Sequence, residues 1–286
     1  PLASEQAVEL LDSADPWFSV GGKIYRFLGP AGACALPENA AFYCEDNLTA
    51  TGIQNPLQRA LNYIQANATI PDDKQVHLEA AAFTSDEVLI DGSNANIAKL
   101  TGIIGAGSGQ TTFTGTSAFI IQNMPGAFTL SGMTINRTGG TAKPVIDFNN
   151  IGGTIKLNDV EVSNSTASHG IRVQNARGSV EMTNVRSENT GGSGALIDNT
   201  AGTGNVTIKN SDFIDGDGGG ITITTNGAVL FEGVSARDNG VNGATLTAGK
   251  GVTVKNSWFS NNTSGHGLSI STHTFGNVVL TWVYSV

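Results

Sequence analysis

The sequence contains little charge, and most of that charge is negative. Lysine and arginine together account for 15 of the 286 residues, against 24 aspartates and glutamates, which gives a net charge of −9 at pH 7. Proteins that bind nucleic acid present a basic surface to the phosphates, so this composition argues against a nucleic acid partner. No apolar run approaches the roughly 20 residues of a membrane-spanning helix, so we expect no membrane span.

Cysteine is equally scarce. The two cysteines, Cys34 and Cys44, lie close together in the stretch GACALPENAAFYCE. We expect a disulfide that closes a short loop in an oxidising compartment, with two buried thiols as the alternative. Since no histidine or further cysteine lies near them, a zinc site is not expected. The chain begins with Pro1 rather than Met, so we expect a processed protein that is secreted to the extracellular space or the cell surface.

Glycine, asparagine and threonine are abundant instead, and they follow an internal repeat. An apolar residue recurs seven times at intervals of 23 to 27 residues, and a second apolar residue follows each one two positions later. This alternation places one face of a strand in a core. The first apolar positions are Phe128, Ile155, Val180, Val206, Val229, Val252 and Val278.

Two further columns belong to the same repeat. Four residues after the first apolar position stand turn residues that tolerate a left-handed backbone, from Gly132 to Asn256, and Trp282 takes this place in the last repeat. A glycine also precedes a second short apolar segment in five of the repeats. These glycines are Gly170, Gly194, Gly220, Gly243 and Gly267.

A repeat of this length, with two short strands and no helix, predicts one coil of a right-handed parallel β-helix. We therefore expect an all-β solenoid of about nine coils between Val76 and Val286. At about 4.8 Å per coil, the rod would be on the order of 43 Å long.

The N-terminal quarter lacks the repeat. Residues 4–13 predict a short helix, and the segments WFSV and KIYRF predict a β-hairpin. Asn55 and Pro56 supply an N-cap followed by proline at the first helical position, which predicts a helix over 55–67 that caps the first coil. The expected parts are residues 1–54, with the short helix, the hairpin and the disulfide loop as a candidate docking element, and residues 55–286, the parallel β-helix with its capping helix.

The stretch from Pro56 to Ile104 resembles the start of right-handed β-helices of the pectin-lyase-like superfamily. An amphipathic helix is followed there by VHLEAAAFTSDEVLI and LTGIIGAG, and members of that superfamily carry a short helix before their first coils. The resemblance covers about residues 55–286 and implies a fold rather than a function. Residues 15–54 also resemble the lead-in of bacterial surface proteins built from β-helix modules.

A polysaccharide lyase or hydrolase with this fold should stack acidic residues on adjacent coils, where they hold Ca²⁺ or act as acid and base. The best catalytic candidates are Asp215 and Asp238, one coil and therefore about 5 Å apart, with Arg237 as a nearby cation. Asp217 would complete a Ca²⁺ site with the two aspartates, and no other cofactor is expected. The column is otherwise asparagine, so a solvated structural ladder is the alternative, and it favours a protein that is not an enzyme. The other members of the column are Asn164, Asn189 and Asn261.

Histidines and hydroxyl groups give two further signals. His169 and His266 would lie four coils apart, roughly 19 Å, which is too far for a shared metal. A Thr-x-Thr or Ser-x-Ser pair recurs in three successive coils. Stacked arrays of this kind resemble ice-binding proteins, and the ordinary preference of threonine for strands is the alternative. The residues are Thr222, Thr224, Thr245, Thr247, Ser269 and Ser271.

The last segment, GNVVLTWVYSV, would leave apolar side chains and backbone groups uncovered at one end of the solenoid. Either a longer chain or another molecule is expected to cover this end. If the hairpin of one copy docks on the last coil of the next, the contact is heterologous and propagates as a filament. The expected interface residues are Trp17, Phe18, Ile24, Tyr25 and Phe27 in the hairpin, and Val278, Leu280, Trp282 and Tyr284 in the last coil.

The sequence thus predicts a secreted structural subunit that assembles head-to-tail with copies of itself into an extracellular filament or sheath, with adhesion as an expected role. The alternative is a polysaccharide-active β-helix enzyme or a carbohydrate-binding surface module, with surface polysaccharide as the partner. Ice binding is the third hypothesis.

Overall fold

The structure is a computed structural model, and most of what it describes is the repeat region. The sequence predictions for the helix over 4–13 and for a disulfide at Cys34 lie outside the described residues, so both stay predictions. The described residues are 17–20, 23–28, 42–44, 56–66, 74–78, 82–84, 87–116, 118–139, 142–272 and 276–286.

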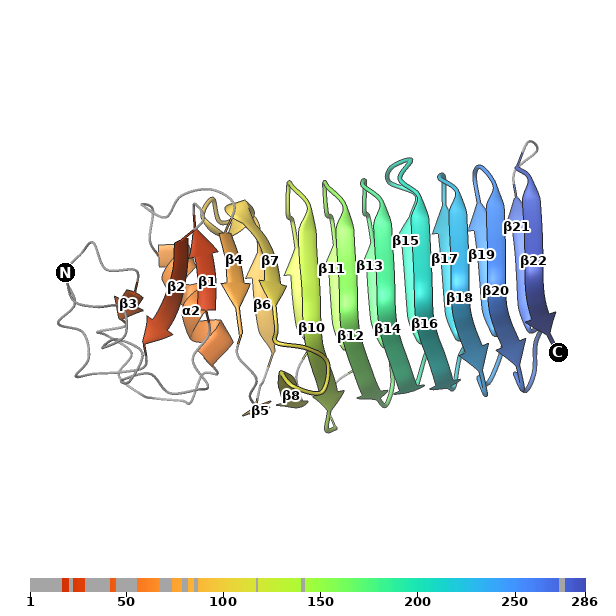
Figure 1. Ribbon diagram of the computed structural model, residues 1–286, viewed down its shortest axis with the longest axis horizontal. Coiled ribbons are helices and arrows are strands. Elements are labelled where there is room, and N and C mark those ends of the chain that lie inside the picture. The colour runs from red at the N-terminus through yellow and green to blue at the C-terminus, as the bar shows by residue number, and fades with distance from the viewer. Residues whose placement is uncertain are drawn as a thin grey trace.

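The described residues form a rod of stacked parallel strands, and each coil contributes a strand to each of two sheets (Figure 1). Along the rod, the first sheet contains β4 (Lys74–His77), β7 (Leu100–Ile104), β10 (Phe128–Arg137), β12 (Ile155–Ser165), β14 (Val180–Thr190), β16 (Val206–Gly216), β18 (Val229–Arg237), β20 (Val252–Ser260) and β22 (Val278–Ser285). The second sheet contains β6 (Val88–Asp91), β9 (Phe119–Gln122), β11 (Ile146–Asn149), β13 (Ile171–Gln174), β15 (Ala195–Asn199), β17 (Ile221–Thr225), β19 (Ala244–Ala248) and β21 (Leu268–Thr272).

The strand register confirms the sequence repeat. Phe128 lies opposite Ile155, and the same column continues coil by coil to Val252 and Val278. Every member of the column from Phe128 to Val252 is buried, because its side chain points into the space between the two sheets. The predicted parallel solenoid is therefore confirmed.

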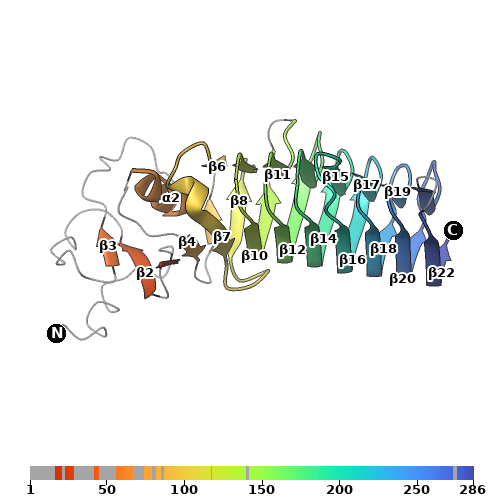
Figure 2. The same cartoon turned by 90° about the horizontal axis from the view of Figure 1, so that it is seen from above.

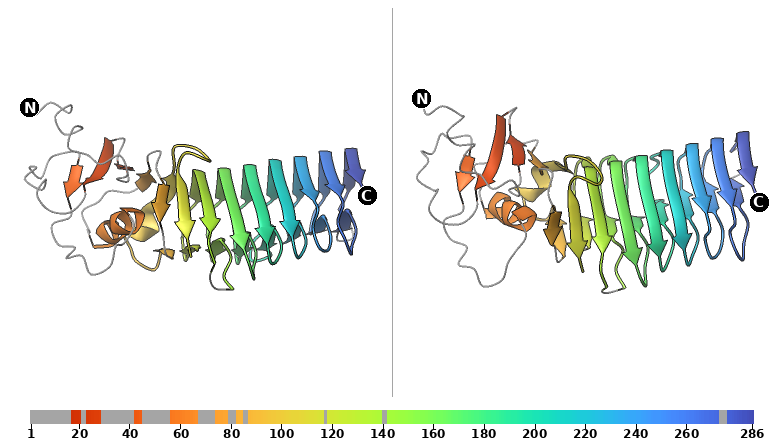
Figure 3. Two further views of the ribbon diagram at one scale, coloured as in Figure 1. Left: turned by 90° about the horizontal axis from the view of Figure 1, so that it is seen from below. Right: turned by 60° about the horizontal axis from the view of Figure 1, so that its bottom comes forward.

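The rod has eight complete turns, because the second sheet holds eight strands. The sequence predicted about nine. The difference arises at the C-terminal end, where β22 begins a further turn and no strand of the second sheet follows it within the described residues. Figure 3 shows both sheets stacked along one axis, with the C-terminus at the end farthest from the N-terminal elements.

Left-handed residues bend the chain at equivalent places in successive coils. The predicted column that begins at Gly132 has a positive φ throughout, and so does a second column in which Asn164 and Asn189 lie. A third column of Asn123, Asn150 and Asn175 follows β9, β11 and β13. Asparagine, aspartate and glycine adopt this conformation at the least cost, which explains their abundance.

The recurring glycines lie where neighbouring coils approach most closely. A Cβ atom added to Gly194 would lie 2.8 Å from the carbonyl oxygen of Gly220 and 3.2 Å from the ring of Phe213. The other glycines of this column meet the next coil in the same way. A side chain at these positions would push two coils apart.

The N-terminal elements lie at the start of the rod (Figure 2). Strand β1 (Trp17–Val20) pairs antiparallel with β2 (Lys23–Leu28) and also with β4, so the edge of the first sheet is already occupied there. Helix α2 (Pro56–Ala66) buries Leu57, Leu61 and Ile64, and its role as a cap stays a prediction. The remaining elements are β3 (Phe42–Cys44), which pairs with β2, β5 (Ala82–Thr84), β8 (Thr112–Gly115) and the short 3-10 helix η1 (Ile97–Lys99).

Candidate functional site

One outward column of the first sheet carries charged, hydroxyl and aromatic side chains. It lies on the half of each long strand that follows the left-handed corner, and from β10 to β20 the residues on either side of it in sequence are buried. Successive members are paired directly across neighbouring strands. We call this column the outer strip; its members are Thr134, Glu161, Arg186, Asp212, Ser235, Trp258 and Tyr284.

The middle of the outer strip is a cluster of one guanidinium and three carboxylates. Glu161, Arg186 and Asp212 lie side by side on β12, β14 and β16. Arg186 donates hydrogen bonds from Nε (3.0 Å) and Nη2 (2.5 Å) to Oε2 of Glu188 on its own strand. The hydrogen bond that Arg186 donates to Glu188, together with the charges of Asp212 and Glu161, raises the pKa of Arg186. With three acidic side chains and one basic one, the cluster carries an excess of negative formal charge.

The C-terminal part of the outer strip is aromatic. Trp258 on β20 lies opposite Tyr284 on β22, and the two side chains are 56% and 53% exposed. Trp258 lies on β20, which is paired with β18 on one side and β22 on the other. The ring is therefore exposed on the lateral face of the rod and not at its end. Tryptophan and tyrosine combine a flat apolar ring with a polar group, which suits them to recognise partners that are themselves amphipathic.

A fixed loop closes the outer strip at its N-terminal end. The segment between β7 and β8 reaches across β10, as Figure 1 shows. Ser108 donates to the Asp159 carboxylate from its amide N (2.9 Å) and from its hydroxyl (2.6 Å), and Gly109 N donates to Thr134 Oγ1 (2.9 Å). Thr134 in turn donates to Glu161 at 3.3 Å. The loop and the acidic cluster are thus connected by hydrogen bonds.

The predicted catalytic aspartates lie in a left-handed column beside the outer strip. Both Asp215 and Asp238 have a positive φ, at 53° and 60°. Asp238 accepts hydrogen bonds from Asn261 (3.1 Å) and from Arg237 (2.7 Å). Among the described residues there is no group of three or more His, Cys, Asp or Glu side chains placed to hold a metal. The Ca²⁺ site with Asp217 stays a prediction, and the contacts of Asp238 are those of a turn ladder.

The second sheet presents an ion pair and the predicted hydroxyl array. Arg172 and Asp147 form a bidentate pair on neighbouring strands, at 2.8 and 2.6 Å. His169 accepts a hydrogen bond at Nδ1 from the backbone N–H of Ser193 (3.0 Å), and burial together with the charge of Arg172 lowers its pKa.

The threonine and serine pairs are in register across β17, β19 and β21, so the array exists on three coils.

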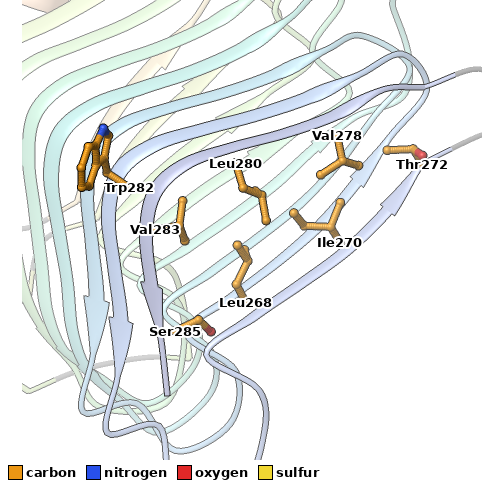
Figure 4. Close-up of a pocket in the computed structure, with 8 residues that line it drawn as sticks. All are labelled: Leu268, Ile270, Thr272, Val278, Leu280, Trp282, Val283 and Ser285. Atoms are coloured by element: carbon orange, nitrogen blue, oxygen red, sulfur yellow. The ribbon is translucent and has the colours of Figure 1, made fainter.

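The C-terminal end of the rod is open and apolar. A hollow of about 750 Å³ lies inside the last coil. Figure 4 shows Leu268, Ile270, Leu280 and Val283 pointing into this interior, whereas Trp282 lies on the other side of the β22 ribbon. Val278, Leu280, Trp282 and Tyr284 are 46%, 52%, 84% and 53% exposed. The side chains of the hairpin residues predicted to dock here lie outside what the structure describes.

Sequence reasoning missed the outer strip, although its signal was present. The repeat alignment fixed the register, and the position six residues after the first apolar one reads Thr, Glu, Arg, Asp, Ser, Trp and Tyr. The predicted catalytic residues Asp215 and Asp238 lie three residues further along the chain. Only the structure shows that the two positions differ in kind, because the first faces outward on a strand and the second is a turn.

The comparisons with known proteins concern the fold. Residues 145–281 match the protein family described as right handed beta helix region. A search of curated protein sequences found no match.

Three solved structures are similar to this chain, each at low sequence identity. The A-module of mannuronan C-5 epimerase AlgE6 from Azotobacter vinelandii is 17% identical, with a TM-score of 0.46 over 80% of this chain and 74% of that one. The catalytic domain of a GH87 α-1,3-glucanase in complex with tetrasaccharides is 12% identical, with a TM-score of 0.48 over 79% of this chain and 56% of that one. The A-module of mannuronan C-5 epimerase AlgE4 from Azotobacter vinelandii is 12% identical, with a TM-score of 0.31 over 80% of this chain and 90% of that one.

The described residues fold as a parallel β-helix, and residues 145–281 of this rod are the part that matches the right-handed β-helix family. Within the described residues, no helix has the length and apolar character required to cross a membrane.

Proposed function

We propose that the protein is a carbohydrate-binding module whose outer strip holds an extended polysaccharide along the rod. The observation that carries this proposal is the row from Glu161 to Tyr284, with one outward side chain per coil. Its members are Glu161, Arg186, Asp212, Ser235, Trp258 and Tyr284. Adjacent coils of a parallel sheet lie about 4.8 Å apart, which is close to the length of one sugar residue in an extended chain.

The chemistry of the outer strip suits a sugar. Carboxylates such as Glu161 and Asp212 accept hydrogen bonds from hydroxyl groups, and charge-assisted hydrogen bonds are the stronger kind. Trp258 and Tyr284 offer flat rings to the apolar C–H face of a pyranose. A row that is polar in the middle and aromatic at one end matches a ligand that alternates hydroxyl edges with apolar faces.

The charge of the outer strip favours a neutral ligand over an acidic one. Arg186 is already bonded to Glu188 and lies between Glu161 and Asp212, so its charge is balanced within the protein. A uronate chain would bring further carboxylates to a surface that has an excess of them, and like charges repel. We therefore propose a neutral glycan as the ligand and assign no catalytic role to these residues.

Calorimetric titration with neutral and acidic oligosaccharides tests the proposal. Cellohexaose, xylohexaose, laminarihexaose and hexagalacturonate are the probes, and at least one neutral chain is expected to bind more tightly than the uronate. Trp258→Ala should weaken that binding about tenfold, the loss expected for one aromatic stacking contact. Thr224→Ala, on the second sheet, is the matched control and should leave affinity unchanged. The proposal fails if no neutral chain binds, or if both substitutions have the same effect.

We propose self-assembly as a second function, because the end of the rod presents apolar side chains around an open hollow. The last strand, β22, offers its outer edge for pairing, and a coil of matching pattern from a second copy would continue both sheets. The contact would be heterologous and would produce filaments. An extracellular location, at the cell surface or in a matrix, is part of both proposals.

A further inference from the structure

Trp282 occupies a backbone position that in every other aligned coil belongs to a turn residue. The corresponding residues, from Gly132 through Asn210 to Asn256, are glycine, asparagine or aspartate, and all have a positive φ. Trp282 has a φ of 53°. A bulky side chain in the left-handed region is a genuine outlier, because its Cβ crowds the following carbonyl oxygen.

The strain at Trp282 is imposed by the coil. On one side of the corner, Thr281 pairs with Lys255, and on the other side Val283 pairs with Ser257. These ladders hold the chain in the bent path that the preceding coils take. The corner has to be left-handed whichever residue stands there, so tryptophan makes the fold less stable than asparagine would.

No described residue covers the indole of Trp282. The indole lies outside the coil interior, on the opposite side of the ribbon from Leu280 and Val283 (Figure 4). It is 84% exposed with respect to the described residues. Strained residues of this kind are retained where the surrounding structure fixes them and the strained group has a function.

Trp282 adjoins the aromatic part of the outer strip. Tyr284 follows it by two positions, and Val283 between them points into the core, so both aromatic side chains face outward. Tyr284 lies opposite Trp258. All three aromatic side chains are exposed, and no charged residue occurs from Gly276 to Val286. An uncharged aromatic surface fits the C–H face of a neutral sugar.

We infer that Trp282 is a sugar-stacking residue, retained at a strained corner because it extends the binding surface of the outer strip around the edge of the rod. This inference rests on the proposed glycan-binding function. On this account, Trp282 lowers the stability of the fold and increases the affinity for the glycan. Such a trade-off between stability and function is common in proteins.

The test is to replace the tryptophan with the residue that the column favours. Trp282→Asn and Trp282→Gly relieve the strain, so both should raise the midpoint of thermal unfolding by a few degrees. The same variants should weaken binding of the best neutral hexasaccharide by about tenfold, measured by calorimetric titration of the full chain. Asn256→Gly is the control at the same corner one coil earlier, and it should change neither quantity by a comparable amount.

The outcomes separate this inference from the function on which it rests. If Trp258→Ala weakens binding and Trp282→Asn leaves it unchanged, the outer strip binds glycan and the inference about Trp282 is wrong. If Trp282→Asn lowers the unfolding midpoint, the tryptophan stabilises the fold and the inference is also wrong. If the wild-type protein binds none of the neutral hexasaccharides, both proposals are wrong.

Discussion

Single residues decide how closely the coils of this protein can stack. The glycine column that includes Gly194 brings the backbone of one coil against the carbonyl groups of the next, and the asparagine columns turn the chain at fixed corners. Both effects depend on backbone geometry. We therefore expect these glycine and asparagine positions to tolerate little substitution, although many of them lie outside the hydrophobic core.

Gly194→Ala should destabilise the protein by about 1–3 kcal/mol, the usual cost of overpacking. The new methyl group would lie 2.8 Å from the carbonyl oxygen of Gly220, which is closer than a Cβ atom approaches in real structures. Urea denaturation followed by circular dichroism measures the change. Gly126→Ala is the control, because an added Cβ there has nothing within 4 Å. Equal stability of the two variants would contradict this account of the glycine column.

At the scale of elements, the turns that lead into the second sheet are held by side chains as well as by strand pairing. His169 precedes β13 and accepts the N–H of Ser193 from the next coil, beside the Arg172–Asp147 pair. The imidazole has to stay neutral at Nδ1 to accept this hydrogen bond. Burial and the charge of Arg172 lower its pKa, so the folded state holds the proton less well than the unfolded chain does.

Folding stability should therefore fall as the pH is lowered through the pKa of an unfolded histidine, about 6.5. The unfolded state binds more protons in this range, so the free energy of unfolding rises with pH and reaches its full value above that pKa. Urea denaturation at several pH values between 5 and 8 measures the slope, and His169→Gln should reduce it. His266→Gln, in an exposed turn, is the comparison. An unchanged slope in the His169 variant would rule out this residue as the source.

At the scale of the whole molecule, each coil contacts its two neighbours, so the rod has two ends whose surfaces differ. At the first end, the edge strand β4 is already paired with β1. At the other end, the outer edge of β22 and the apolar interior are uncovered by any described residue. This asymmetry is the structural basis for the self-assembly proposal.

Leu280→Asp should abolish filaments while leaving the rod folded. The substitution places a charge in the open hollow, where a second copy would have to bury it, and burial of an unpaired charge is strongly unfavourable. Because Leu280 is 52% exposed, the isolated rod should lose little stability. Negative-stain electron microscopy of wild type and variant measures the outcome, and Thr281→Asp, on the outward side of β22, is the matched control. Dispersed wild-type rods at every concentration would exclude assembly.

The architecture, the alignment of the coils and the left-handed corner that begins at Gly132 all follow from the amino-acid sequence alone. Repetition makes this possible, because an apolar position that recurs seven times specifies the strand, its inward face and the neighbour against which it packs. The corner residues could be predicted for the same reason, since glycine, asparagine and aspartate share the backbone conformation that a stacked corner requires.

The outward residues that form a common surface can be identified only from the three-dimensional structure. Glu161, Arg186 and Asp212 are separated by more than twenty residues in the chain, and their common column is meaningful only once the half-strand that carries them is known to face solvent. The same holds for Trp282, which reads as part of an apolar end in the sequence and stands outside the coil in the structure. Sequence spacing gives the register of a solenoid, whereas the left-handed corner between the two halves of each long strand sets the direction of every side chain that follows it.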